Sequence, residues 1–509
     1  MDIRTAAGQR LSFGFRGTSI PEEFAAIVRE FKIGNVILFR YNVENTRQLR
    51  KLCADIQELV QHETGQPAFI SIDQEGGMVT RLPRDAVNVP GNMAVAATGR
   101  AQDAYDAAAV TARQLRGLGI NFNLAPVLDV NSNSKNPVIG VRSFGDSAAR
   151  AAELGALAVK GYGDNGVLCC GKHFPGHGDT AVDSHLGLPC IDKSLGELRT
   201  EELVPFRAAI AAGIPAIMSS HILFPQIEPA GVPATMSRRI MHDILRGELG
   251  FGGLTLSDCM VMDAIRMHYG TANGAVAAMK AGVDIVYVSS NPQLQRESAQ
   301  AVLAAAERGE LDGENMQESL ARILAAKSRF AFTDARGELC GREEDYAAAR
   351  SISRHAVVHV SGGICAAGEN SFFCGCADYR VTQAANDDPD ALPFPEYMHR
   401  RFGGKYAVCS TDPDETEIRR IAAMAAGCGN IIMSTCNAHI YTGQIRLAAA
   451  LAATGVKMTA AALRNPYDLP LLPESVGKLA VFDYTPDSLS ALCEVLSGGE
   501  CTGAMPVRL

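Results

Sequence analysis

VLCCGKHFPGHGDTAVDSHLG, residues 167–187, joins a short apolar run to a polar loop that is broken by proline and glycine. The apolar run at 167–170 predicts a buried strand. Pro175, Gly176 and Gly178 interrupt any regular element after it, so the histidines and aspartates that follow must lie largely on a loop. A buried strand that ends in such a loop is typical of α/β enzymes, which present reactive groups at strand ends.

This unit of strand and polar loop is one of a series. Apolar runs separated by helical patterns predict strands at 10–15, 35–39, 68–72, 121–130, 167–173, 216–222, 253–260 and 284–290. Eight strands that alternate with helices predict a (β/α)8 TIM barrel, with a doubly wound sheet as the alternative. Polar segments follow many of these strands, among them DQEGG, LDVNSN, SSH and SDCM. In a barrel such strand ends share one face and converge, which favours the barrel.

A second alternation of strands and helices follows the first. Strands are predicted near 356–362, 405–411, 430–436, 456–463 and 478–484, with helical patterns between them. The polar stretch before this alternation predicts a linker at 336–354. We therefore expect a TIM-barrel catalytic domain at 1–335 and a smaller three-layer α/β sandwich at 355–509.

The composition disfavours several classes of partner. A net charge of −9 without a long Lys/Arg run disfavours nucleic acid and anionic membrane surfaces. No apolar stretch approaches the roughly 18 residues of a membrane span, and the N-terminus lacks the pattern of a signal peptide. The fourteen cysteines are then expected to be reduced thiols, which predicts a cytoplasmic protein. The sequence leaves open whether the chain forms a homodimer.

The polar loop within residues 171–187 has three interpretations. A hydrogen-bonded turn is the simplest. A metal site is the second, since His173 and His177 are four residues apart, but the intervening proline and glycine disfavour the helix that would align them. In the third, Asp183 and His185 are two apart on an extended segment and point the same way, so the carboxylate can hold and polarise the imidazole for acid/base chemistry.

Asp258, in the segment SDCM after the seventh strand, is the candidate partner of that pair. A carboxylate at this place either caps a helix or forms a salt bridge, or else acts on a ligand at the barrel mouth. Retaining glycoside cleavage needs a carboxylate on one face of the sugar and an acid/base across the bond. His185 suits the second role, because an imidazole with a pKa of about 6.5 exchanges protons near neutral pH.

Other polar residues at predicted strand ends are candidates for binding a sugar. Asp73, which precedes the glycine pair of DQEGG, can accept hydrogen bonds from two hydroxyls or can close an Asx turn. Arg81 and Arg142 can donate forked hydrogen bonds, although a surface or salt-bridged arginine is the simpler interpretation of each. His221, after the sixth strand, fits a pocket and a core position equally well.

Five motifs together resemble glycoside hydrolase family 3, and in particular its β-N-acetylglucosaminidase branch: KHFPGHGDTAVDSH, DQEGGMVTRL, NLAPVLDV, VRSFGD and LTLSDCM. The similarity covers roughly residues 10–330, with the motifs in matching order. ARSISRHAVV and ALRNPYDLPLL are similar to the second domain of longer family members.

The resemblance implies a barrel that removes non-reducing terminal N-acetylglucosamine from β-linked glycans, such as muropeptide and chitin fragments. It implies retention of configuration, and neither a metal nor an organic cofactor. By motif position, Asp258 corresponds to the nucleophile, and His185, paired with Asp183, to the acid/base. The positions that bind the sugar fall on Asp73, Arg81, Arg142, Lys172 and His173.

Other functions stay open at this point. A β-N-acetylglucosaminide phosphorylase is a close alternative, because a neutral histidine repels an incoming phosphate less than a carboxylate does. The DSH segment disfavours a β-glucosidase or β-xylosidase, and the presence of Asp183, His185 and Asp258 disfavours an inactive sugar-binding protein. A metal-dependent barrel hydrolase is the remaining class. Met78 departs from the branch, where a polar residue is common, which puts the detail of the sugar subsite in question.

Overall fold

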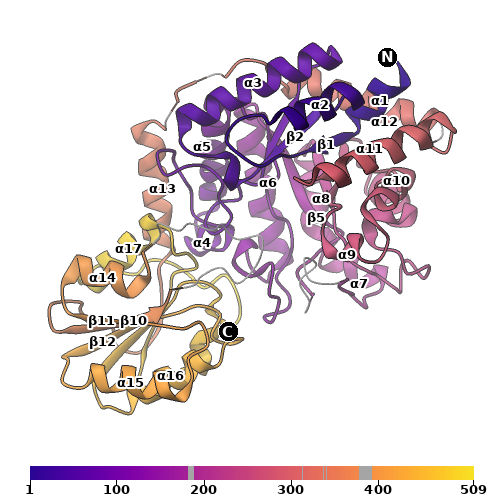
Figure 1. The fold of residues 1–509 in the computed structure, drawn as a ribbon. Helices are drawn as coiled ribbons and strands as arrows, with labels where there is room; N and C mark the ends of the chain where they lie inside the picture. Colours follow the sequence, from indigo (N-terminus) through magenta and orange to yellow (C-terminus); the bar gives the residue numbers. More distant parts are fainter. Residues whose placement is uncertain (181–187, 312, 336, 340, 378–391) are drawn as a thin grey trace.

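The computed structural model describes residues 1–180, 188–311, 313–335, 337–339, 341–377 and 392–509. Figure 1 shows two lobes, the first built from the N-terminal part of the chain and the second from the C-terminal part. Among the residues described, no helix is both long enough and apolar enough to cross a bilayer.

The first lobe is a closed barrel of parallel strands. In the described part of the chain the strands follow one another around the barrel in sequence order, and β1 closes it by pairing with β8. The strands are β1 (Leu11–Phe13), β2 (Asn35–Leu38), β3 (Phe69–Ile72), β4 (Phe122–Asn123), β5 (Leu168–Phe174), β6 (Ala216–Ser219), β7 (Leu254–Cys259) and β8 (Ile285–Val288). The predicted TIM barrel is confirmed.

Helices surround this barrel, and their ends follow local sequence rules. The Asn45 side chain accepts a hydrogen bond from the Gln48 N–H at the start of α3, and Gly65 ends that helix in the left-handed conformation. The helical elements of this lobe are α1 (Ile3–Gln9), α2 (Glu22–Phe31), α3 (Thr46–Thr64), α4 (Asn92–Ala97), α5 (Gln102–Leu118), η2 (Gly140–Arg142), α6 (Ala148–Asp164), α7 (Leu195–Thr200), α8 (Leu203–Ala211), the π-helix η4 (Arg239–Glu248), α9 (Asp263–Arg266), α10 (Thr271–Ala281), α11 (Pro292–Glu307) and α12 (Gly313–Phe330).

The interior of the barrel is packed, and α12 closes its amino-terminal end. Phe69 and Phe122 meet edge to face inside the barrel, with ring centroids 5.3 Å apart, and Ile323 and Phe330 of α12 join the same apolar cluster. Lys327 of α12 is buried there, and its Nζ donates to Gln9 Oε1 at 2.6 Å and to the Gly34 carbonyl at 2.8 Å. Because these side chains fill the amino-terminal end, the carboxyl ends of the strands are the side at which a ligand site is expected.

The second lobe is a three-layer α/β sandwich, as predicted. Its sheet has the order β11-β10-β12-β13-β14-β9, and β9 pairs antiparallel with β14 while the other pairs are parallel. Figure 1 shows α14 and α17 on one face of the sheet, and α15 and α16 on the other. The elements are β9 (Val358–Ser361), β10 (Ser371–Cys376), α14 (Phe394–Phe402), β11 (Lys405–Cys409), α15 (Glu415–Ala425), β12 (Asn430–Thr435), α16 (Gly443–Ala452), β13 (Lys457–Ala462), η5 (Pro466–Leu471), β14 (Gly477–Ala480) and α17 (Pro486–Leu496).

The stretch predicted as a linker contains most of a helix, α13 (Glu343–Ala356). Ala349, Ile352 and Ala356 recur on one side of it and are buried, while the intervening charged residues give the stretch its polar composition. The helix packs against α4 and α5 of the barrel and against α17 of the second lobe. The helix joins the two lobes as a packed element, because its apolar residues form a narrow row that continues along the helix.

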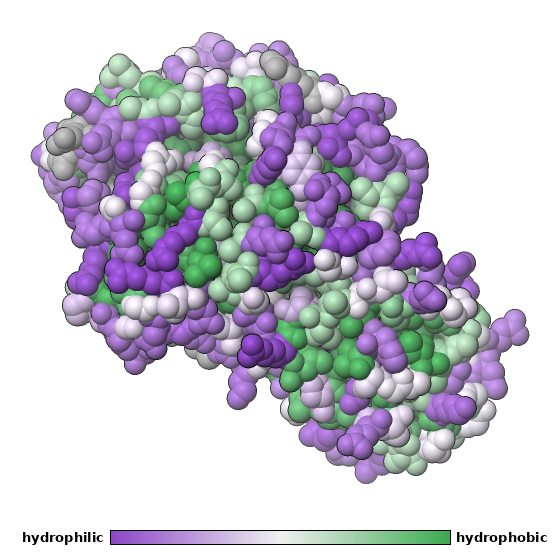
Figure 2. Space-filling model, turned by 180° about the vertical axis from the view of Figure 1, so that it is seen from behind, coloured by the Kyte–Doolittle hydropathy of each residue, from purple (hydrophilic) through white to green (hydrophobic). Residues whose placement is uncertain are grey.

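The two lobes share a hydrophobic core. Met78, Met93 and Val141 of the barrel belong to the same buried cluster as the core of the second lobe. The Ala504 N–H donates to the Ala97 carbonyl at 2.7 Å across the same boundary. Seen from behind in Figure 2, the lobes meet along one side, and apolar surface on both is interspersed with polar side chains.

Candidate active site

A cavity of about 490 Å³ opens at the carboxyl ends of the barrel strands. This volume lies in the range of small-molecule sites. Ile37, Leu124, Met218 and Tyr287 contribute its apolar or aromatic surface. Its polar and charged lining residues include Asp73, Glu75, Arg81, Arg142, Lys172, His173, His177 and Asp258.

The buried end of Lys172 lies between two carboxylates. Its Nζ is 2.7 Å from Asp73 Oδ1 and 2.7 Å from Glu75 Oε1, and its side chain is 2% exposed. Glu75 also pairs with Arg142, whose Nε and Nη2 each donate to one carboxylate oxygen at 2.8 Å. We call Asp73, Glu75, Arg81, Arg142 and Lys172 the charged cluster.

The members of this cluster stabilise one another in the charged form. Burial raises the pKa of Glu75, but the Arg142 guanidinium and the Lys172 ammonium outweigh burial and hold that pKa well below its ordinary value. Burial lowers the pKa of Lys172, and the Asp73 and Glu75 carboxylates raise it above its ordinary value in spite of that. Glu75 and Lys172 are therefore both charged at neutral pH.

The DQEGG segment places Glu75 by means of its two glycines. Gly76 has φ of +98° and Gly77 of +56°. A Cβ at Gly76 would lie 2.6 Å from the Pro90 carbonyl oxygen, and one at Gly77 would lie 2.7 Å from the Gly91 nitrogen. Only glycine allows this close approach of two backbone segments.

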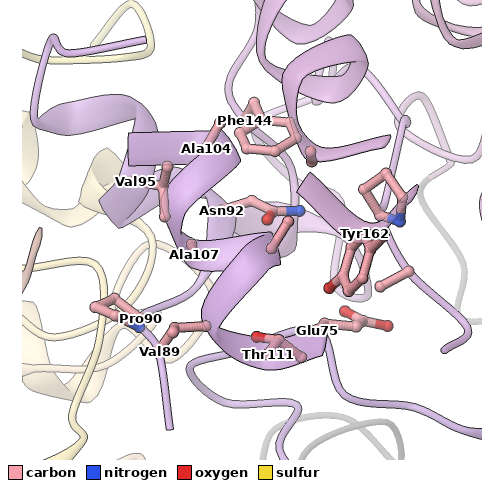
Figure 3. A pocket seen from close by; sticks show the side chains of 14 residues that line it. Glu75, Val89, Pro90, Asn92, Val95, Ala104, Ala107, Thr111, Phe144 and Tyr162 are labelled. Carbon is pink, nitrogen blue, oxygen red and sulfur yellow. The ribbon is translucent and has the colours of Figure 1, made fainter. Parts of the chain in front are cut away.

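Glu75 also lines a second, much smaller cavity of about 20 Å³, which Figure 3 shows from close by. Thr111, Tyr162 and Asn92 lie around the same space. Its size and partly polar lining suit one buried water molecule. Glu75 thus lines both cavities.

Asp129, which follows β4, organises the histidines of the KHFPGHG segment. Its Oδ2 is 2.7 Å from His173 Nδ1, and its Oδ1 accepts the backbone N–H of His173 at 3.1 Å and of His177 at 2.8 Å. Burial raises the pKa of Asp129, but His173 outweighs burial, and the resulting pKa is below the ordinary value. Burial lowers the pKa of His177 to about 4, so this side chain is neutral at pH 7.

Asp258 lines the same cavity as the charged cluster. It belongs to β7, which is four strands away from β3 around the barrel. Its Oδ1 accepts the N–H of Cys259 at 2.7 Å, and the residue is partly exposed to the cavity. A carboxylate thus shares the cavity with a set of hydrogen-bond donors and acceptors, which is the arrangement that attack on a bound sugar requires.

Two aromatic rings line part of the cavity wall. Phe39 and Tyr41 stack with ring centroids 5.3 Å apart, and the Arg16 guanidinium lies 4.9 Å from the centre of the Tyr41 ring. The Tyr41 hydroxyl is 2.6 Å from Ser290 Oγ, which ties this wall to the end of β8. Flat apolar faces of this kind suit the C–H face of a sugar ring.

His173 and His177 each lie within hydrogen-bond distance of a neighbouring side chain. His173 pairs with Asp129, while His177 Nδ1 lies 3.0 Å from Thr180 Oγ1. Across the part of the chain that the structure describes, no three or more His, Cys, Asp or Glu residues gather in a way that could hold a metal ion.

The family model described as the glycosyl hydrolase family 3 N terminal domain matches residues 7–326. The chain belongs to glycosyl hydrolase family 3. The resemblance predicted from the motifs, including the β-N-acetylglucosaminidase branch, is confirmed by the relatives as well.

Relatives in family 3 match the barrel or the whole chain. Beta-hexosaminidase A of Pseudoalteromonas piscicida is 40% identical over 334 residues, which span 61% of this chain but only 56% of that protein. Beta-hexosaminidase of Pseudomonas aeruginosa is 36% identical over 293 residues, 57% of this chain and 84% of the relative. A solved family 3 beta-N-acetylglucosaminidase from Paenibacillus sp. str. FPU-7 has a TM-score of 0.91 at 36% identity, and the match covers 100% of this chain and 99% of that one.

The structure brings most of the predicted site residues of this family 3 chain together. Of the described residues, Asp258 and the five predicted sugar-binding positions all line the cavity: Asp73, Arg81, Arg142, Lys172 and His173. Asp183 and His185 lie outside the described residues.

Of the two places considered for His221, the structure shows the core position. It is buried and is not among the described residues that line the cavity. Its Nδ1 lies 2.9 Å from Thr235 Oγ1, and its Nε2 lies 3.1 Å from the carbonyl oxygen of Cys259. His221 therefore supports the end of β7, next to Asp258, from behind.

Two residues of the site were not predicted, Glu75 and Asp129. Glu75 lies two residues after Asp73 in DQEGG, and Asp129 lies in the polar segment LDVNSN after β4. The position of both segments at strand ends was the available signal. Their partners, Arg142 for Glu75 and His173 for Asp129, are 67 and 44 residues away in the sequence.

Proposed function

We propose that this chain is a retaining β-N-acetylhexosaminidase that removes terminal N-acetylglucosamine from the non-reducing end of β-linked glycans. The observation that carries the proposal is Asp258, whose partly exposed carboxylate lines the same cavity as the charged cluster at the carboxyl ends of the barrel strands. The full-length similarity to a protein described as a beta-N-acetylglucosaminidase supports the choice of sugar.

In this proposal the charged cluster binds the terminal sugar. The partly exposed Asp73 accepts hydrogen bonds from hydroxyl groups, while Lys172 and Arg142 donate. These three side chains are already held by ion pairs, so little side-chain entropy is lost when a sugar binds. Asp129 holds the His173 ring in one orientation at the edge of the same subsite.

Asp258 is the proposed nucleophile. One of its oxygens forms a bond to the anomeric carbon as the bond from that carbon to the leaving oxygen breaks. The leaving oxygen takes a proton from His185, for which Asp183 is the proposed partner. A water molecule then gives a proton back to His185 and attacks the anomeric carbon, which releases Asp258 and restores the original configuration. The roles of His185 and Asp183 rest on the motif resemblance alone.

Phosphorolysis is the second candidate. The observation that keeps it open is the cationic side of the cavity, where Arg81, Arg142 and Lys172 could attract an anion. Two of these cations already pair with carboxylates at 2.7–2.8 Å, which favours hydrolysis by water.

The test is the release of nitrophenol from the β-N-acetylglucosaminide and the β-glucoside, side by side, with and without added phosphate. Cleavage of the N-acetyl substrate alone, at a rate indifferent to phosphate, is the expected result. A large stimulation by phosphate, with sugar 1-phosphate as the product, would assign a phosphorylase. If neither substrate is cleaved, an inactive sugar-binding protein becomes the favoured interpretation.

Cell-wall muropeptides and chitin oligosaccharides are the proposed natural substrates, and the cytoplasm is the proposed location. The thirteen cysteines in the described residues are all free thiols, which suits a reducing compartment. A comparison of turnover on a muropeptide and on a chitin disaccharide would decide which substrate is preferred.

A further inference from the structure

The second lobe does not line the cavity but touches the loops that do. The described residues around the cavity all come from the barrel. Two barrel loops extend from the cavity to the second lobe: residues 74–91, which carry Glu75 and Arg81, and residues 131–145, which carry Arg142. Among the described residues, these loops connect the second lobe to the cavity lining.

The Tyr467 hydroxyl, on η5 of the second lobe, holds the loop 131–145. It accepts a hydrogen bond from Asn131 Nδ2 at 2.9 Å. The other side-chain atom of that amide, Asn131 Oδ1, accepts the N–H of Gly140 at 3.0 Å. Gly140 begins the short helix η2 that ends at Arg142. A single amide therefore links the second lobe to the turn that presents Arg142.

The Asn465 side chain packs against the same turn. Gly140 has φ of +44°, and a Cβ on it would lie 2.3 Å from Asn465 Oδ1, so the amide packs directly against its backbone. On the barrel side, Asn92 Nδ2 donates to the carbonyl of Arg142 at 2.8 Å. The backbone of η2 is thus held between the two lobes.

Tyr467 is itself fixed within its own lobe. Its ring meets the His439 ring edge to face, with centroids 5.7 Å apart. His439 is held by Asp468, whose Oδ1 lies 2.7 Å from His439 Nδ1 and accepts the His439 N–H at 2.9 Å. Asp468 is fully buried. Tyr467 therefore reaches the barrel from a rigid support and not from a free loop.

The second domain contacts the other cavity loop as well. The Arg464 guanidinium approaches Met78 Sδ at 3.1 Å, and a Cβ on Gly77 would lie 3.2 Å from Asp483 Oδ2. Met78 is the residue where the sequence departs from the branch, and in this chain its side chain is buried in the boundary between the lobes.

We infer that Tyr467 and Asn465 are positioning residues for sugar binding. They hold the turn that carries Arg142, so that the Arg142 guanidinium pairs with Glu75 in the charged cluster. The inference rests on the proposed function for the identity of the sugar. It assigns the second domain a role in substrate affinity, although that domain contributes none of the described cavity-lining side chains.

The test compares Tyr467→Phe with Tyr397→Phe. Both substitutions remove one hydroxyl from the second domain, but Tyr397 lies on α14, which packs on β10 and β11. Tyr467→Phe should raise KM for the nitrophenyl N-acetylglucosaminide about three- to tenfold, the effect of one lost hydrogen bond, with kcat changed less than about twofold. Tyr397→Phe should leave both constants unchanged. Asn465→Ala, which removes the second contact, should raise KM in the same way.

Hydrogen–deuterium exchange gives a readout that is independent of activity. In Tyr467→Phe the peptide covering 131–145 should exchange about fivefold faster than in the wild type, while the melting temperature stays close to the wild-type value. An unchanged KM, or unchanged exchange in 131–145, would overturn the inference. A fall in kcat as large as the rise in KM, together with a lower melting temperature, would assign Tyr467 a purely structural role. If the wild type cleaves no N-acetylglucosaminide, the proposed function fails, while the exchange rates still decide whether Tyr467 holds the loop.

Discussion

The ion pair between Arg142 and Glu75 should stabilise the barrel far more than an exposed pair of similar geometry. Both of its hydrogen bonds are 2.8 Å long, and its side chains are 5% and 3% exposed. Glu75→Gln leaves two buried cations, Arg142 and Lys172, with less compensating negative charge. Arg142→Met is milder, because Glu75 still pairs with Lys172.

The magnitude follows from the distance and the burial. Two unit charges 2.8 Å apart attract by about 6 kcal/mol at an effective dielectric constant of about 20. Part of this attraction is offset by the cost of removing both charges from water, so the loss of one partner costs about 3–5 kcal/mol of unfolding free energy. The double variant removes both charges and keeps Lys172 paired with Asp73. Its cost should therefore fall short of the sum of the single costs by about 2–3 kcal/mol.

The exposed pair of Arg199 and Glu248 provides the matched control. It also has two hydrogen bonds, of 2.8 and 2.6 Å, but its side chains are 45% and 31% exposed. Arg199→Met and Glu248→Gln should couple by less than about 1 kcal/mol. Urea unfolding followed by far-UV circular dichroism measures both double-mutant cycles. A coupling free energy at the buried pair no larger than at the exposed pair would refute the reasoning.

Three further predictions concern proton transfer and pH. His185→Ala should lose less activity on nitrophenyl glycosides than on disaccharides, because nitrophenol leaves without protonation; equal losses would contradict the acid/base role. Burial raises the pKa of Asp483 from 3.8 to about 6, so the folded state loses about 3 kcal/mol as pH rises from 3 to 7; urea midpoints of Asp483→Asn should lack that loss, and parallel curves would exclude it. Burial lowers the pKa of Lys327 from 10.5 to about 7, so unfolding free energy should gain about 1.4 kcal/mol per pH unit from 7 to 10; thermal unfolding of Lys327→Met should show a smaller gain, and an identical gain would count against the lowered pKa of Lys327.

The barrel could be predicted because each of its strands is a continuous apolar run followed by a helical pattern. β4 shows the limit of that signal, since the predicted strand at 121–130 is reduced to Phe122–Asn123. Pro126 lacks an N–H, and the chain beyond it turns toward the cavity to deliver Asp129. β10 was not predicted, because SFFCGC contains a glycine and shows no alternation, and its assignment depends on pairing with β11 and β12.

The site could be predicted residue by residue but not as a network. Asp73, Lys172 and Asp258 each follow or end a strand, which places them at the barrel mouth. Neither strand periodicity nor motif spacing indicates that Glu75 bridges Arg142 and Lys172. The hydrogen bond between Asn131 of the barrel and Tyr467 of the second lobe joins residues that are 336 positions apart in the sequence. Such contacts depend on how the lobes pack, which local patterns do not encode.

The central claim is that Asp258 attacks the anomeric carbon of N-acetylglucosamine. An N-acetylglucosaminyl fluoride with a second fluorine at carbon 5 slows the breakdown of a covalent glycosyl-enzyme, so the intermediate can be digested and located by mass spectrometry. The account predicts one bound sugar per chain, attached to Asp258, and no adduct on Asp258→Ala. An adduct on another residue, or none while the enzyme turns over the fluoride, would contradict the account.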